Sequence, residues 1–113
     1  FQIRNVLVSD ITWVSEGVQP GKGVTISLRD RFIPRKIFLD KLLQLAAKSG
    51  IPYQLEVEGD GSSDGREIQM SPFPIDWCFV GAPEELVHSP EERVYLKDVD
   101  AMIDMYNYLM KNL

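Results

Sequence analysis

The sequence predicts a mixed α/β fold in which a sheet with parallel pairings and at least one antiparallel or edge strand packs against two amphipathic helices. Three observations support this class. Four short apolar runs have the length of strands, two longer segments have helical periodicity, and the two kinds of segment are interleaved along the chain. With 113 residues, of which 44% are hydrophobic, the chain is large enough to bury one ordinary core. We therefore expect one domain or domain fragment over residues 1–113.

The predicted strands occupy residues 6–8, 24–28, 53–57 and 75–80. The first and last are continuous apolar runs, which is typical of strands buried on both faces. The third alternates apolar and polar residues, so one of its faces should be less buried and it should lie near an edge. Because a helix precedes it, we expect it to pair in parallel after a right-handed crossover.

Two long helices are predicted. The first covers residues 34–49, with Pro34 in its first turn and Gly50 as its stop. The second covers about residues 97–112, and a short helix is expected over 65–70. The predicted apolar stripe of the last helix contains Leu96, Val99, Ile103, Tyr106, Met110 and Leu113.

Charge and cysteine content exclude several classes of partner. The net charge is -5 and no long cluster of basic residues is present, which argues against binding to nucleic acid or to anionic membranes. No apolar run has the length of a membrane span. The single cysteine, Cys78, lies within a predicted strand, so we expect a core thiol in a reducing, cytoplasmic compartment. Because residue 1 is phenylalanine, we expect the chain to be a piece of a longer protein.

Three polar features follow predicted strands. Asp10 follows residues 6–8, the loop 58–65 follows the third strand, and His88, the only histidine, follows the last strand. Ligands of open α/β sheets bind at the carboxyl ends of strands, so these features are expected to converge on one rim. Each also has a structural interpretation: Asp10 as a turn residue, the glycine-rich segment as a surface loop, and His88 as a loop residue without function.

Five short motifs occur in order along nearly the whole chain. Together they resemble the carboxyl-terminal part of the glutamyl or tetrahedral (TET-type) aminopeptidases, a family of cellulase-like dinuclear metallopeptidases. The motifs are Val-Ser-Asp-Ile-Thr at 8–12, Gly-Lys-Gly at 21–23, Ile-Pro-Tyr-Gln-Leu-Glu-Val at 51–57, Gly-Ser-Ser-Asp-Gly at 61–65 and Val-His-Ser-Pro at 87–90.

The resemblance implies a three-layer α/β/α domain of the phosphorylase/hydrolase-like type, of which this chain would be the carboxyl-terminal part. It implies an enzyme that binds two zinc or cobalt ions, removes amino-terminal residues from peptides and assembles into large homo-oligomers. A carboxylate and a neutral imidazole are suitable ligands for either metal. Asp10 matches the family's ligand to one ion and His88 matches its ligand to the other.

Two features depart from the family pattern. Ser62 and Ser63 replace a glycine and a threonine in the loop that borders the site, where Asp64 is retained. The remaining metal ligands and the paired glutamates that include the general base come from preceding sequence. We therefore expect no catalytic residue in this chain, weak or absent metal binding by the chain alone, and no activity.

The glutamate pairs at 84–85 and 91–92 do not match the catalytic pair in position, and they are expected to be solvated charges. A second hypothesis stays open, namely a non-catalytic α/β module that descends from such an enzyme and serves in assembly or peptide binding. Upstream sequence with the missing ligands would decide between the two.

Overall fold

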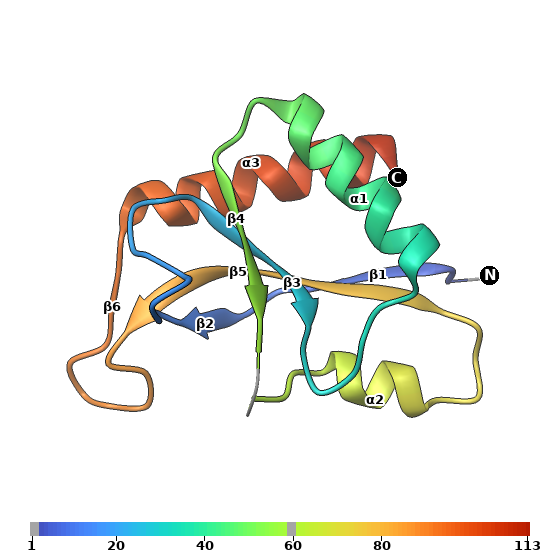
Figure 1. The fold of residues 1–113 in the computed structure, drawn as a ribbon, viewed down its shortest axis with the longest axis horizontal. Helices are drawn as coiled ribbons and strands as arrows, with labels where there is room; N and C mark the ends of the chain where they lie inside the picture. Colours follow the sequence, from blue (N-terminus) through green and yellow to red (C-terminus); the bar gives the residue numbers. More distant parts are fainter. Residues whose placement is uncertain (1–2, 59–60) are drawn as a thin grey trace.

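A computed structural model describes residues 3–58 and 61–113 and contains one six-stranded sheet with three helices (Figure 1). Residues 59–60 of the predicted loop lie outside the described residues. The elements in chain order are β1 (Asn5–Val8), β2 (Ile11–Trp13), β3 (Val24–Arg29), α1 (Lys36–Ser49), β4 (Tyr53–Val57), α2 (Gly65–Met70), β5 (Asp76–Glu85), β6 (Arg93–Val94) and α3 (Leu96–Asn112).

Strand β5 is the centre of the sheet, whose order is β1-β5-β3-β4. β1 and then β2 pair in parallel with successive parts of β5. β3 pairs antiparallel with β5 and parallel with β4, which confirms the predicted parallel crossover and the edge position of β4. β6 adds a short antiparallel pairing at the end of β5.

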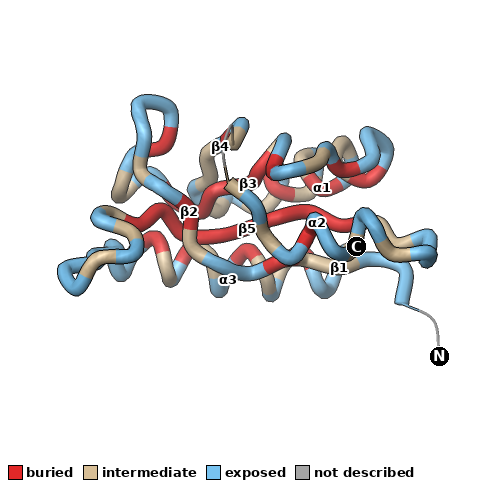
Figure 2. Tube along the Cα trace, turned by 90° about the horizontal axis from the view of Figure 1, so that it is seen from below, coloured by how far each residue is buried: buried red, intermediate tan, exposed pale blue. Residues whose placement is uncertain are grey.

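The helices cover both faces of the sheet and so form three layers (Figure 1). α1 and α3 pack on one face and α2 on the other. The predicted α/β class is confirmed. The main core lies between the sheet and the two long helices, and its buried members are Val24, Ile26, Phe38, Leu42, Ala46, Cys78, Val80, Ala101, Met105 and Leu109. Figure 2 shows the buried stretch that runs along β5.

The contact between α2 and the sheet depends on a glycine. A Cβ at Gly65 would lie 2.5 Å from the ring of Trp77, so a larger residue would displace the helix from β5. The Trp77 Nε1 also donates to Gln69 Oε1 at 2.8 Å, which satisfies the polar group of a buried indole.

β5 is longer than predicted, because residues 81–83 do not leave the sheet. β2 was predicted to be part of a loop, yet it pairs with β5 through residue 84. β6 then pairs with Glu84 and Glu85. These pairings keep the segment extended despite Pro83.

The predicted apolar stripe of α3 is wrong in its exposed members. Leu96, Ile103 and Met110 lie on the solvent side, whereas the fully buried residues of this helix are Asp98, Ala101, Met105 and Leu109. The two sets lie on different faces of the helix, and both contain apolar residues. Periodicity alone therefore could not identify the face that packs.

Helix α1 begins at Lys36 and not at Pro34. Arg35 has an extended backbone with ψ of 134°, so the helical turn starts after it. Its guanidinium makes a bidentate ion pair with Asp76 at 2.6 and 2.7 Å. Among the described residues, none of the helices is long and apolar enough to cross a membrane.

Candidate functional site

Asp10 lies between β1 and β2 and is held against β5 by its backbone. Its carbonyl oxygen accepts a hydrogen bond from Ala82 N at 3.3 Å. A Cβ at Gly81 would lie 2.2 Å from that oxygen, so only glycine permits this approach. The exposed carboxylate accepts a hydrogen bond from Ile11 N through Oδ1 at 2.8 Å.

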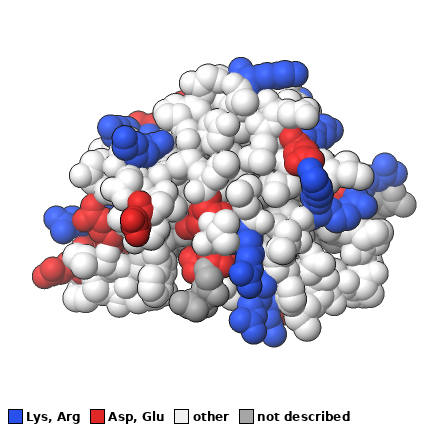
Figure 3. Space-filling model, viewed as in Figure 1, with Lys and Arg blue, Asp and Glu red and all other residues white. Residues whose placement is uncertain are grey.

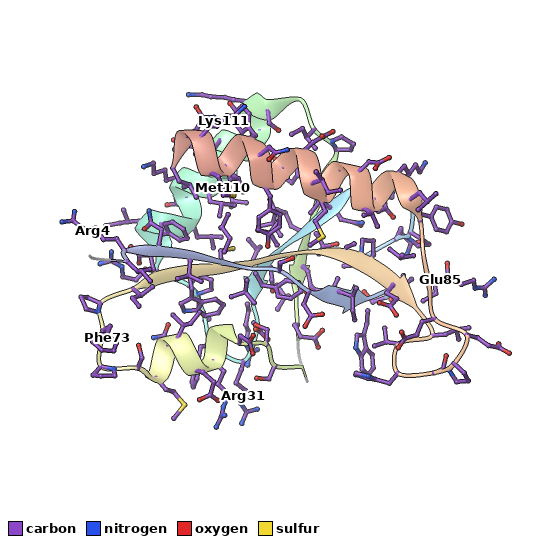
Figure 4. The ribbon with its side chains drawn as sticks, turned by 180° about the vertical axis from the view of Figure 1, so that it is seen from behind. Arg4, Arg31, Phe73, Glu85, Met110 and Lys111 are labelled. Atoms are coloured by element: carbon purple, nitrogen blue, oxygen red, sulfur yellow. The ribbon has the colours of Figure 1, made fainter. Side chains whose placement is uncertain are left out.

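His88 lies in a tight loop between β5 and β6, near the end of the molecule marked by Glu85 and opposite the end marked by Phe73 (Figure 4). Leu86 and His88 both have left-handed backbones, with φ of 56° and 64°. Such residues cost about 1–3 kcal/mol each and persist where the surroundings impose the conformation. Here the Ser89 hydroxyl and N–H both donate to the Leu86 carbonyl oxygen, at 2.6 and 3.1 Å.

The side chain of His88 is exposed, and two further interactions hold the loop around it. Its backbone N–H donates to Glu92 Oε1 at 2.6 Å. Its ring lies in edge contact with Trp13, with ring centroids 6.5 Å apart and planes at 76°. The imidazole is therefore presented to solvent next to the end of β2.

Glu84 is buried at the end of β5, between β2 and β6. Burial raises the pKa of its carboxyl, and a hydrogen bond with Glu92 and the charges of Glu92 and Asp10 raise it further, whereas His88 lowers it. Asp10 and His88 thus lie near enough to the same carboxyl group to act on it electrostatically. Whether they bind metal stays a prediction.

The expectation that Glu84 is a solvated charge is wrong. It is 7% exposed, because β2 pairs with it on one side and β6 on the other. Sequence reasoning missed it because β5 was expected to end before it. Gly81 and Pro83 interrupt the residue pattern that could have shown that the strand continues to Glu84.

The loop containing Ser63 and Asp64 reaches the candidate site from a different direction than predicted. β4 runs antiparallel to β5, so the expectation that both strands end at the same rim of the sheet is wrong, although Glu56 near the end of β4 is hydrogen bonded to Thr12 of β2. Ser63 instead reaches across the face of the sheet, where it lines a small cavity with Thr12 and Trp13. Asp64 is exposed at the start of α2 and does not line that cavity.

Two buried carboxylates shape this small cavity of about 70 Å³. Asp30 accepts hydrogen bonds from both the N–H and the hydroxyl of Ser63. Glu56 accepts from the Thr12 hydroxyl at 2.5 Å, and burial raises the pKa of its carboxyl. Figure 3 shows acidic side chains gathered in this part of the surface, below the end of β4.

The donor types fit a zinc or cobalt site, but the described residues do not complete one. Asp10 offers a carboxylate oxygen and His88 an imidazole, both common ligands for these ions. Within residues 3–58 and 61–113, no group of three histidine, cysteine, aspartate or glutamate side chains is placed to hold a metal ion. Other ligands would have to come from outside the described residues.

Two solved aminopeptidase structures have the same fold as this chain. The structure aligns over 95% of its length with an aminopeptidase from the archaeon Desulfurococcus kamchatkensis, with a TM-score of 0.89 and 24% identity, and it covers 34% of that chain. It also aligns over 94% of its length with the TET1 peptidase of Pyrococcus horikoshii, with a TM-score of 0.82 and 23% identity, and it covers 32% of that chain. The three-layer fold is thus that of aminopeptidase catalytic domains.

The family follows from the sequence. The model of the M42 glutamyl aminopeptidase family matches residues 5–105. A putative aminopeptidase from Acetivibrio thermocellus is 33% identical over 89 residues, which cover 78% of this chain and 27% of that protein. The chain belongs to the M42 family, and it spans between about a quarter and a third of the length of these relatives.

Proposed function

We propose that this chain is the carboxyl-terminal part of a dinuclear metalloaminopeptidase domain and that it contributes one ligand to each of two divalent ions. Asp10 would bind one ion and His88 the other. The observation that carries this proposal is that both exposed residues lie next to β2: Asp10 directly precedes the strand, and the His88 ring contacts Trp13 at its end. Membership of the M42 family supports the same chemistry.

The residues of this chain would bind the metal ions and position the site. Other parts of the parent protein would supply the remaining ligands and the general base. A bound pair of zinc or cobalt ions would polarise a water molecule and the scissile carbonyl group. The hydrogen bonds of Ser89 and Glu92 would hold the His88 loop in one conformation, so that the imidazole needs little reorganisation. Ser63 and Asp64 would border the site from the other side of Trp13.

The parent protein would act on the amino termini of peptides in the cytoplasm and assemble into large homo-oligomers. Support for assembly comes from the TET1 peptidase of P. horikoshii, which forms a tetrahedron or an octahedral shell. The net charge of -5 is consistent with a peptide substrate and with no role for nucleic acid or membrane.

The experiment compares this chain with the longer parent protein in calorimetric zinc titrations and in hydrolysis of aminoacyl anilides. The chain alone should bind zinc weakly and should not turn over, because a catalytic zinc normally has three protein ligands. The parent should bind tightly and be active with zinc or cobalt. Turnover by the 113 residues alone would refute the expected incompleteness, and an inactive metal-loaded parent would favour the non-catalytic module.

A further inference from the structure

Trp13 is the most unusual apolar residue near the candidate site. It is 60% exposed, although it is the last residue of a strand that pairs with the central strand of the sheet. The other tryptophan, Trp77, is 1% exposed and hydrogen bonded. An exposed indole in contact with the predicted ligand His88 is placed where a substrate of this site would pass.

The indole forms one wall of a cavity of about 480 Å³. This volume lies within the range of about 300–1,000 Å³ that is usual for small-molecule sites. Its lining combines apolar surface with two carboxylates and includes, among the described residues, no lysine or arginine; the residues are Trp13, Val14, Glu84, Glu85, Leu86 and Val87. The cavity on the other side of Trp13 has only about 70 Å³, too little for a long side chain.

We propose that the larger cavity is the subsite for the amino-terminal side chain of the peptide, that Trp13 is its specificity-determining wall, and that it selects lysine or arginine. The proposal rests on the proposed peptidase function. Lysine and arginine combine an apolar stem with a cationic head, which matches a wall of indole and leucine near carboxylates. An acidic side chain would meet the like charge of Glu85, which lines the cavity.

Glu85 lies 3.7 Å from Arg93, a long and exposed contact that contributes little. Glu84 is buried beside the cavity with Glu92 and Asp10 as its acidic neighbours. A group in the cavity is thus favoured when it carries a positive charge, because Glu85 lines the cavity and its ion pair with Arg93 is weak.

The first test is binding of amino-acid amides to this chain, followed by tryptophan fluorescence. Argininamide mimics a cationic amino-terminal residue, leucinamide an apolar one, and the α-amide of glutamic acid an acidic one. Argininamide should bind at least about fivefold more tightly than leucinamide, and the difference should shrink at 1 M salt. Trp13→Phe should abolish the fluorescence response, since the remaining Trp77 is buried away from the cavity.

The second test uses the longer parent protein and separates this inference from the proposed function. Turnover of arginyl and lysyl anilides should exceed that of leucyl and glutamyl anilides in kcat/KM. Trp13→Ala should lower kcat/KM for the cationic substrates about tenfold, mostly through KM, without changing the metal content. Ile37→Ala, an exposed change on α1, is the matched control.

The outcomes are distinct. Metal-dependent turnover that is fastest on glutamyl or leucyl anilides, or that is unaffected by Trp13→Ala, overturns the subsite and leaves the peptidase function standing. Equal binding of the three amides to the chain likewise overturns the subsite and leaves the peptidase function standing. Absence of turnover on every anilide overturns the proposed function and this inference with it.

Discussion

Asp98 shows how one buried side chain connects distant parts of the fold. Its carboxylate accepts hydrogen bonds from Gly21 N at 2.7 Å and from Gly23 N at 2.9 Å, and it is fully buried. Gly23 has a φ of 104°, and a Cβ there would lie 2.2 Å from the Pro52 carbonyl oxygen, so the loop has little freedom to find other partners. From the sequence, Asp98 was only an acidic residue in the first turn of a helix.

Replacing Asp98 with alanine should lower the free energy of unfolding by about 2–4 kcal/mol, because two glycine N–H groups lose their acceptor. Asp100→Ala, an exposed change in the same helix, should cost less than about 0.5 kcal/mol. Urea denaturation of both variants measures the difference. Equal stability of the two would show that water or a shifted loop satisfies the glycine N–H groups.

Glu56 should make stability depend on pH. Burial raises the pKa of its carboxyl above the ordinary value of 4.5, so the folded protein holds this proton more tightly than the unfolded chain. The stabilisation that Glu56 adds to the free energy of unfolding is therefore present at acidic pH. It is lost as the pH rises from the ordinary pKa of 4.5 through the raised pKa of the folded state. Glu56→Gln, which keeps an acceptor for Thr12, should lose this decline in the free energy of unfolding.

The measurement is a series of urea denaturations of the wild type and Glu56→Gln between about pH 4.5 and 8. The advantage of the wild type at acidic pH should disappear toward neutral pH. Glu67→Gln, a change at an exposed carboxylate, serves as control and should run parallel to the wild type. Parallel curves for Glu56→Gln as well would show that Glu56 titrates normally.

Residue types that carry chemistry could be recognised from the sequence, but their surroundings could not. Asp10 and His88 were identified by short motifs that resemble those of a known family. The burial of Glu84 and the contact between His88 and Trp13 depend on pairings that only the folded chain shows. The left-handed backbone at His88 likewise has no local sequence signal, because residues other than glycine rarely adopt it.

At the scale of elements, the sequence predicted the bounds of a helix or strand where its residue pattern was distinct from that of its neighbours. β4 and α2 have the predicted bounds, and α3 begins one residue earlier than expected. β2 and β6 are two or three residues long and exist through their pairing with β5, so no local pattern indicated them. In α3, apolar residues on two faces made the packed face ambiguous.

Two methionines of α3 test which face packs. Met105 is fully buried, whereas Met110 is 74% exposed. Met105→Ala should cost about 2–5 kcal/mol of the free energy of unfolding, through lost burial and a cavity in the core. Met110→Ala should cost less than about 0.5 kcal/mol. Thermal or urea denaturation compares them, and a larger loss for Met110→Ala would restore the stripe predicted from the sequence.

At the scale of the whole molecule, the α/β class and the mixture of parallel and antiparallel strands followed from the order of elements, but the antiparallel pairing of β3 with β5 did not. β3 and β4 run against β5, so the loop after β4 meets the candidate site across the face of the sheet instead of along one rim. The same architecture recurs in aminopeptidase chains about three times as long.

The central claim is that Asp10 and His88 each bind one metal ion in the longer parent protein. The most direct measurement is the metal content per chain of that protein and of Asp10→Asn and His88→Asn, determined by mass spectrometry. Asparagine tolerates the left-handed backbone at position 88, so the variant removes the imidazole with little strain. Glu91→Gln, three residues further along the same loop, is the control.

The wild type and Glu91→Gln should hold two ions per chain, and each ligand variant should lose one of them while keeping its circular dichroism spectrum. Retention of two tightly bound ions in both Asp10→Asn and His88→Asn would contradict the assignment of these residues as metal ligands.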